Sequence, residues 1–372
     1  MTGPSAHTRT YLDYNATAPL RSEARDAMLA VFEHVGNPSS VHVEGRWARR
    51  IVEEAREAVA ELVGASPSEV VFTSGGTEAN RLALEGSGRS HRIVSAIEHP
   101  SILTQATSTL PAERGGIVDL SPLDSLMGPA GEGSIVSLML ANNETGVLQP
   151  VPEMAEKVRT AGAYSHSDAV QAPGKISLNF KELDVDLLTI SAHKLGGPTG
   201  VGALVVRDGL EMAPTVSGGG QERGRRAGTE NLPGIAGFGA AAALARQKQP
   251  REAEHVASLR DRLEAGVRER SPDAEIHGAV SDRLPNTSCI GLPGTSAETL
   301  VMAFDLAGIA VSAGSACSSG KVTPSHVLTA MGLPEVDAAS AIRVSLGWAS
   351  SERDVEQFIK SWGDIVGRRG GV

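Results

Sequence analysis

Short apolar runs alternate with segments of helical period through most of the chain, and this alternation constrains the fold more than any other feature of the sequence. Strands that alternate with helices form a mostly parallel sheet whose faces are covered by helices. We therefore predict an α/β fold. The runs that we predict to be strands cover residues 69–73, 92–96, 134–140, 163–167, 186–191 and 202–206.

A polar stretch that ends in Pro250 marks a change in this pattern. Proline lacks the N–H that continues a helix, so we expect one helix to end there and another to run from residue 251 to about residue 270. A chain of 372 residues also commonly divides into two cores. We expect a large domain before the break and a smaller α+β domain after it. The smaller domain has predicted strands at 274–278, 286–291 and 341–346, and predicted helices at 296–306, 324–331 and 352–366.

The charge balance limits the possible partners, since 34 Lys and Arg residues face 44 Asp and Glu residues and the net charge is −10. This balance argues against binding to nucleic acid or to an anionic membrane. The sequence has no apolar stretch long enough to span a bilayer and no apolar signal segment near its start, so we expect a cytoplasmic protein. In that reducing compartment a disulfide between Cys289 and Cys317 is not expected.

Polar side chains follow the predicted strands at the points where these strands end. The carboxyl ends of parallel strands meet at one edge of a sheet, where α/β proteins bind their ligands. We therefore expect these side chains to converge on one crevice. They belong to Thr77, His99, Asn143, Asp168, His193 and Lys194.

Lys194 ends the segment Ser-Ala-His-Lys and enters a turn rich in glycine and proline. Taken alone, such a lysine is more often a surface residue. Asp168 changes this interpretation, because a lysine that binds pyridoxal phosphate needs an acidic group that keeps the pyridine nitrogen protonated. For an isolated aspartate after a strand, a helix N-cap is the commoner explanation. Gln171, one turn further on, could donate a hydrogen bond to the phenolic oxygen of the ring.

The segment 72–80, Phe-Thr-Ser-Gly-Gly-Thr-Glu-Ala-Asn, is a candidate phosphate site because glycines there lead from a strand into a helix. The fingerprints of dinucleotide sites and of P-loops are absent from the sequence. His99 is placed to stack on a flat ring and to move protons, although a lone histidine is more often structural. The ten histidines show no metal-ligand spacing, so no metal is expected.

Cys317 lies in a run of small residues at 312–320, which indicates an accessible thiol, either reactive or part of a flexible linker. Cys289 belongs to a predicted strand and reads as an inert buried residue. Arg343 places a charge inside an apolar strand and therefore needs a partner. That partner is either a substrate carboxylate or an internal Asp or Glu. The basic, glycine-rich loop at 218–229 suits anions, or is simply a solvated loop.

Nine segments, in order and in register, resemble those of the cysteine desulfurases. They cover residues 11–19, 36–40, 74–78, 98–99, 142–146, 168–171, 191–194, 223–229 and 314–317. Members of this family are pyridoxal phosphate enzymes of the class V aminotransferase group, with fold-type I architecture and an obligate homodimer. The resemblance implies a large cofactor-binding domain at 16–250. It also implies a small α+β domain, formed by 1–15 and 251–372, that carries the Cys317 loop.

The resemblance also implies a role for each matched residue. For the cofactor ring these residues are Lys194 as the covalent attachment, Asp168 at the pyridine nitrogen, Gln171 at the phenolic oxygen and His99 stacked on the ring. For the phosphate they are Gly76, Thr77, Ser191, His193 and Thr229 of the partner subunit. For the substrate carboxylate they are Asn37, Asn143 and Arg343. Cys317 is the implied nucleophile.

The implied reaction converts L-cysteine to L-alanine and leaves a persulfide on Cys317, from which the sulfur passes to an acceptor protein such as an iron–sulfur scaffold. A selenocysteine lyase or another class V enzyme is an alternative of the same group. An alternative of a different class is a catalytically silent sulfur-relay scaffold that keeps the fold for binding. The combination of Lys194, Asp168, His99 and Cys317 argues against the silent scaffold.

Overall fold

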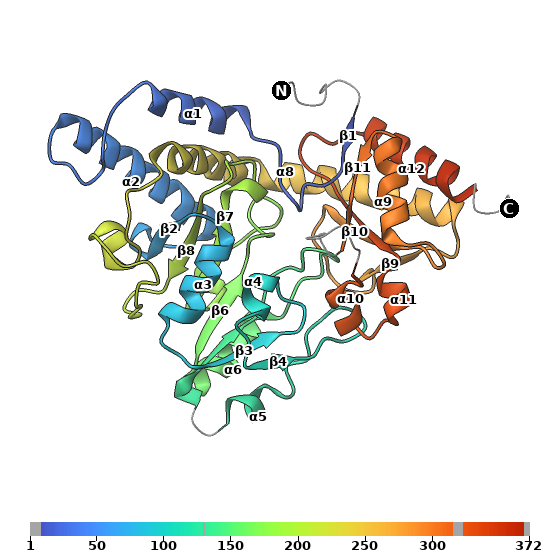
Figure 1. Ribbon diagram of the computed structural model, residues 1–372, viewed down its shortest axis with the longest axis horizontal. Helices are drawn as coiled ribbons and strands as arrows, with labels where there is room; N and C mark the ends of the chain where they lie inside the picture. Colours follow the sequence, from blue (N-terminus) through green and yellow to red (C-terminus); the bar gives the residue numbers. More distant parts are fainter. Residues whose placement is uncertain (1–8, 129–130, 315–322, 368–372) are drawn as a thin grey trace.

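The computed structural model describes residues 9–128, 131–314 and 323–367. Its centre is a seven-stranded sheet with the order β2-β8-β7-β6-β5-β3-β4 (Figure 1). Neighbouring strands from β7 to β4 are parallel, whereas β8 runs antiparallel to both β7 and β2. This arrangement confirms the predicted α/β class. The strands are β2 (Val70–Thr73), β3 (His91–Ser95), β4 (Ser108–Leu110), β5 (Ser134–Ser137), β6 (Tyr164–Asp168), β7 (Leu187–Ser191) and β8 (Gly202–Val206).

The sheet is buried on both faces, which explains why the strands β2, β7 and β8 are apolar along most of their length. Val70 and Phe72 of β2 belong to one hydrophobic cluster, and Val71 between them belongs to another. The first cluster includes α2 (Val43–Val63), α6 (Val151–Thr160) and the start of α8 (Leu232–Arg270), and the second includes α3 (Gly76–Gly86) and α4 (Pro100–Leu103). The remaining helices of this region are α1 (Ser22–Phe32), α5 (Leu123–Met127) and α7 (Phe180–Leu183).

The helix break expected at Pro250 is wrong, because α8 continues from Leu232 to Arg270 with Pro250 inside it. Its first part contributes Phe238 to the core around the large sheet, and its last part contributes Leu263 to a second core. Packing at both ends therefore outweighs the missing N–H. The side chains around the proline are largely exposed, so water can bind the carbonyl oxygen left without its helical donor.

A second core lies under a four-stranded antiparallel sheet with the order β12-β13-β10-β9. The N-terminal strand β1 (Thr10–Tyr11) pairs in parallel with β11 (Ile309–Ala310), so Leu12 is buried against residues from the other end of the chain. The chain segment after β1 then runs back toward the large sheet (Figure 1). The elements are β9 (Glu275–His277), β10 (Thr287–Gly291), β12 (Ser312–Ala313), β13 (Ala341–Ser345), α9 (Ala297–Leu306), α10 (His326–Ala330), α11 (Glu335–Ala338) and α12 (Glu352–Gly367).

The structure differs from the sequence-based prediction in smaller ways as well. The short edge strand β4 was not predicted, and β5 ends at Ser137, earlier than the expected residue 140. Within the described residues, no helix is both long and apolar enough to cross a membrane. The division into domains near residue 250 stays a prediction.

The contact between α2 and α8 depends on a glycine. A Cβ added at Gly239 would lie 2.6 Å from the Cα of Ala55, and backbone cannot yield as a flexible side chain can. We expect Gly239→Ala to force the helices apart and to lower the free energy of unfolding by about 1–3 kcal/mol. Urea unfolding followed by circular dichroism measures this loss. Gly367→Ala, where the added Cβ meets nothing within 4 Å, is the matched control. Equal midpoints for the two variants would contradict the prediction.

Candidate active site

A cavity of about 550 Å³ lies where the large sheet meets the antiparallel sheet. Residues that follow β6 and β7 line one side, and residues of β12 and β13 line another. All six strand-end residues predicted to converge lie on its wall. Among the predicted site residues, those that line it are Gly76, Thr77, His99, Asn143, Asp168, Gln171, Ser191, His193, Lys194 and Arg343.

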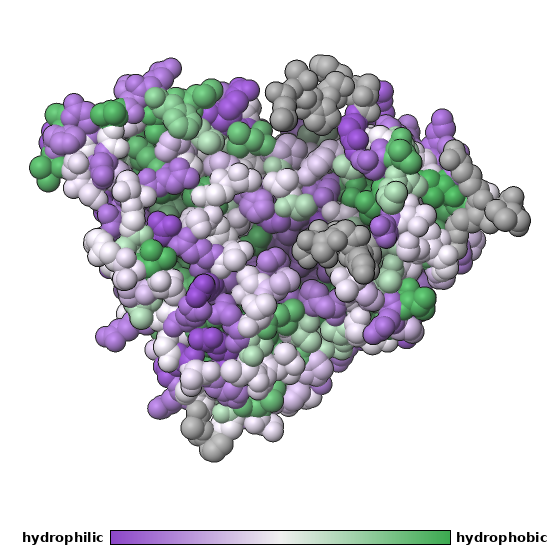
Figure 2. Space-filling view, in the orientation of Figure 1, coloured by the Kyte–Doolittle hydropathy of each residue, from purple (hydrophilic) through white to green (hydrophobic). Residues whose placement is uncertain are grey.

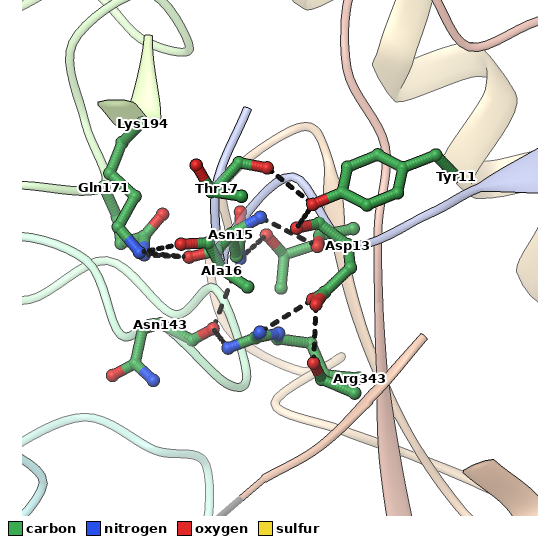
Figure 3. Close-up of polar contacts among 12 residues, drawn as sticks. Tyr11, Asp13, Asn15, Ala16, Thr17, Asn143, Gln171, Lys194 and Arg343 are labelled. Atoms are coloured by element: carbon green, nitrogen blue, oxygen red, sulfur yellow. Dashed lines mark hydrogen bonds and ion pairs between the residues drawn. The ribbon is translucent and has the colours of Figure 1, made fainter. Parts of the chain in front are cut away.

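Lys194 lies in a single 3₁₀ turn that directly follows β7. Its Nζ donates to the carbonyl oxygens of Asn15 at 2.6 Å and Ala16 at 2.7 Å (Figure 3). The pKa of Lys194 is lowered to about 8, mainly by burial and also by the charge of Arg343, whereas Asp13 and Asp168 oppose the shift. An amine with this pKa is partly unprotonated near neutral pH and can act as a nucleophile or a base.

Asp168 is buried at the end of β6, and both of its carboxylate oxygens are used. Oδ1 accepts a hydrogen bond from the backbone N–H of Val170 at 2.9 Å in the turn that follows the strand, and no helix begins there, so Asp168 is not the helix N-cap considered as the alternative. Oδ2 accepts from Nδ2 of Asn80 at 2.8 Å. The hydrogen bond with Asn80 plays no part in the turn that ends the strand. It fixes a carboxylate on the wall of the cavity.

The start of α3 forms an anion-binding corner. The φ angle of Gly75, the residue before the helix, is +153°, a value that favours glycine. The first turn of a helix leaves backbone N–H groups without helical partners, and its dipole attracts negative charge. Opposite it, the Oγ of Ser191 is buried and has no hydrogen-bond partner among the described residues. A Cβ at Gly76 would lie 3.0 Å from Cγ2 of Val170, so the corner has no room for a larger residue. These features fit a phosphate group.

Two histidines flank the cavity with lowered pKa values. His99 caps α4, and its Nδ1 accepts from the backbone N–H of Ser101 at 3.1 Å, so we assign the proton of the neutral ring to Nε2. Burial is the main cause that lowers the pKa of His99. Burial and the neighbouring Lys194 lower the pKa of His193 to about 4. Both rings are therefore neutral at pH 7.

Arg343 has the internal partner that was considered as the alternative to a substrate. Its Nη2 lies 2.8 Å from Oδ1 of Asp13, and its Nη1 donates to the carbonyl oxygen of Asn143 at 3.1 Å (Figure 3). Its Nε is buried without a partner among the described residues. The guanidinium is therefore held in place but keeps one donor unused beside the cavity.

The structure does not bring every predicted residue to the cavity. Asn37 is exposed, and its Oδ1 accepts from the backbone N–H of Ser39 at 2.9 Å. Thr229 is exposed as well, and neither residue lines the cavity. Cys317 lies outside the described residues. Cys289 is a buried residue of β10, as predicted, and burial raises the pKa of its thiol, so this residue is inert.

Asn15, Lys175 and Asp13 are among the polar residues at or beside the cavity that the sequence analysis did not single out. The Asn15 carbonyl oxygen accepts from Gln171 as well as from Lys194, and Lys175 donates to the side chain of Gln171. Asp13 and Asn15 belong to a matched sequence segment, which was the available signal. Lys175 follows a Pro-Gly turn, where a lysine reads as a surface residue. No periodic pattern marks any of the three.

Comparisons with known proteins show the family to which the chain is similar. The sequence profile of the class-V aminotransferases matches residues 10–358. A cysteine desulfurase of Cereibacter sphaeroides is 43% identical over 96% of both chains. The cysteine desulfurase IscS of Dictyoglomus turgidum is 42% identical over 93% of this chain and 91% of its own. The structure of a NifS-like protein from Rickettsia africae has a TM-score of 0.91 and 36% identity, and the match covers 97% of this chain and 100% of that one.

The lowered pKa of Lys194 can be measured in the protein without ligands. We expect the ¹³C-methylated amine of Lys194 to titrate by NMR with a midpoint near 8, because burial disfavours its charged form. Lys194→Met identifies the signal. Asp13→Asn removes a charge that raises this pKa, so the midpoint should fall in that variant. A midpoint at the ordinary value of 10.5 would contradict the assignment.

Proposed function

The chain belongs to the class-V aminotransferase family and is a pyridoxal phosphate-dependent cysteine desulfurase, and we propose which of its residues carry out the reaction. The substrate is L-cysteine, and the sulfur atom of this substrate passes to an acceptor. The observation that carries the residue assignment is the single cavity wall that holds Lys194, Asp168, His99 and the start of α3. We further propose a cytoplasmic protein with a large domain at 16–250 and an acceptor of the iron–sulfur scaffold type.

The cavity offers a partner for each part of the cofactor. Lys194 would hold it covalently, Asp168 would face the pyridine nitrogen, Gln171 would donate to the phenolic oxygen, and His99 would lie on the ring. When bound, pyridoxal phosphate withdraws electrons from the Cα of an attached amino acid. The phosphate would be held at the corner of α3 and β7 by Gly76, Thr77, Ser191 and His193. The unpartnered Ser191 hydroxyl is the strongest support for this placement.

Arg343 and Asn143 would bind the carboxylate of L-cysteine. A guanidinium binds a carboxylate through its N–H groups, and the Nε of Arg343 has no other partner in the described structure. Asp13 already holds Nη2, so the substrate meets an arginine whose direction is fixed. This preorganisation reduces the entropy lost when the substrate is positioned.

Lys194 and His99 would move the protons. Because burial lowers its pKa to about 8, the Nζ of Lys194 can accept the proton from the substrate Cα near neutral pH. His99 is neutral at that pH and carries its proton on Nε2 in the assigned tautomer, so it can donate there and be restored by solvent. The two groups therefore serve as base and acid in one cavity.

Cys317 would take the sulfur. Its thiolate attacks the sulfur of the substrate, the new S–S bond forms as the C–S bond breaks, and the electron pair of the C–S bond stays on the substrate carbon, which is then protonated to give L-alanine. Gly314, the last described residue before Cys317, lines the cavity. Cys289 is buried and cannot substitute.

A homodimer would complete the site. Apolar side chains are exposed along the end of α1, the following loop and the start of α2, a region that appears at the upper left of Figure 2. These residues are Leu29, Phe32, Val35, Val41 and Val43. Contiguous exposed apolar surface marks an interaction site. Asn37 lies in the same loop, so pairing through this face would place Asn37 at the interface. We propose that Asn37 and Thr229 of each subunit reach the cavity of the other.

Replacing the proposed nucleophile tests the chemistry. Purified Cys317→Ser should bind pyridoxal phosphate as the unmodified protein does, yet form L-alanine from L-cysteine at least about 100-fold more slowly, because it lacks the thiolate. Alanine is quantified by chromatography and the persulfide by mass spectrometry. Cys289→Ala is the matched control, and it should form both L-alanine and the persulfide as the unmodified protein does. Alanine formation by Cys317→Ser at the unmodified rate would refute the assignment.

A charge in the exposed apolar face tests the dimer. We expect Phe32→Glu to convert a dimer into monomers in light scattering, because Phe32 is 68% exposed in the single chain and would be buried on pairing. Its alanine formation should fall as the monomer fraction rises. Leu306→Glu, on the exposed end of α9, is the control and should leave the mass unchanged. A monomeric mass for the unmodified protein would contradict the proposal.

A further inference from the structure

Lys175 is a lysine that the proposed reaction does not use, yet its amine lies beside the site. Its Nζ donates to Oε1 of Gln171 at 2.6 Å and to Oδ1 of Asn15 at 2.9 Å. The residue also lines a small cavity of about 30 Å³, of which Lys194 forms another wall. A lysine amine in contact with two side-chain amide oxygens is therefore packed directly behind the residues that face the larger cavity.

The contact with Gln171 determines which end of its amide faces which way. A glutamine amide has one end that only accepts and one end that only donates hydrogen bonds. The amine of Lys175 binds the accepting end, Oε1, so Nε2 points the other way and donates to the carbonyl oxygen of Asn15 at 3.0 Å. The carbonyl oxygen of Asn15 is shared, because it also accepts a hydrogen bond from Lys194. The hydrogen bond from Nε2 to this oxygen therefore holds Gln171 less firmly than an unshared one would.

We propose that Lys175 is a positioning residue that holds Gln171 with its Nε2 available to the phenolic oxygen of the cofactor. The inference rests on the proposed function, in which Gln171 contacts that oxygen. An amide turned by half a rotation would present Oε1 to an oxygen that carries negative charge, and the two would repel. Lys175 removes this alternative without touching the cofactor itself.

The surroundings of Lys175 allow it to act without adding a second full charge beside Lys194. Burial lowers the pKa of Lys175 well below its ordinary value, and the charges of Lys194 and Arg343 lower it further. An unprotonated amine still has two N–H groups, which match its two acceptors on Gln171 and Asn15. An arginine would stay charged, so Lys175→Arg should restore the hydrogen bond only in part.

Lys175→Met tests the inference because it keeps the length of the side chain and removes both donors. We expect the dissociation constant for pyridoxal phosphate, measured by fluorescence on protein freed of cofactor, to rise about 5- to 20-fold, as the loss of one oriented hydrogen bond would give. We also expect the pH midpoint of the visible absorbance of the bound cofactor to rise, because a phenolic oxygen that lacks its N–H donor keeps its proton to higher pH. Lys181→Met, on the exposed start of α7, should change neither value.

The decisive comparison combines Lys175→Met with Gln171→Ala. If Lys175 acts through Gln171, the double variant should have the same dissociation constant and the same absorbance midpoint as Gln171→Ala alone. The inference would be overturned if Lys175→Met had its full effect on these two values in the Gln171→Ala protein. It would also be overturned if Lys175→Met changed only the thermal midpoint of the cofactor-free protein. Lys175→Gln replaces the methionine variant if that one does not fold.

Failure of the inference and failure of the assignment beneath it give different results. A shifted absorbance midpoint in Gln171→Ala, together with an unchanged one in Lys175→Met, would overturn the role of Lys175 alone. Unchanged values in Gln171→Ala would overturn the role of both residues. The desulfurase reaction itself is tested by alanine formation and does not depend on either result.

Discussion

Asn15 is the residue whose hydrogen bonds join Lys194 and Gln171 to the strands of the antiparallel sheet. Its carbonyl oxygen accepts from Lys194 and Gln171, its Nδ2 donates to Thr287 in β10, and its N–H donates to Ser345 in β13. The residue is 1% exposed, so any of these groups left unpaired would cost about 1–3 kcal/mol. One short segment therefore ties the lysine of the large sheet to the strands of the antiparallel sheet. The geometry of the cavity depends on both cores being formed.

The charges in the cavity are balanced around the same segment. Arg343 lowers the pKa of Lys194, and Asp13 raises it, while Asp13 also forms the ion pair with Arg343. A buried arginine without such a partner would be strongly unfavourable. Asp13 therefore pairs with the buried arginine and also opposes its effect on the pKa of Lys194. The segment that follows the N-terminal strand β1 thus contributes to the charge balance beside the large sheet.

The sequence allowed the class of fold and the wall of the cavity to be predicted, because both follow from local rules. Parallel strands bring their carboxyl ends to one edge, so Asp168 and Lys194 could be placed together without coordinates. Asn15 and Lys175 could not, because their contacts join segments as far apart as 330 residues, and neither segment has a periodic pattern. The break expected at Pro250 failed for a related reason. Helix propensity is local, whereas α8 is held by two cores at once.

The two oxygens of Asp13 also connect Arg343 with strand β12, which precedes Cys317 in the chain. Oδ1 lies 2.8 Å from Arg343, and Oδ2 accepts from the hydroxyl of Ser312 at 2.7 Å. Ser312 is also the register partner of Arg343 where β12 pairs with β13. The last described residues before Cys317 are therefore fixed relative to the arginine by a strand pairing and by a shared carboxylate. Gly314, which lines the cavity, directly follows β12, so these contacts also set where this part of the cavity wall lies relative to Arg343.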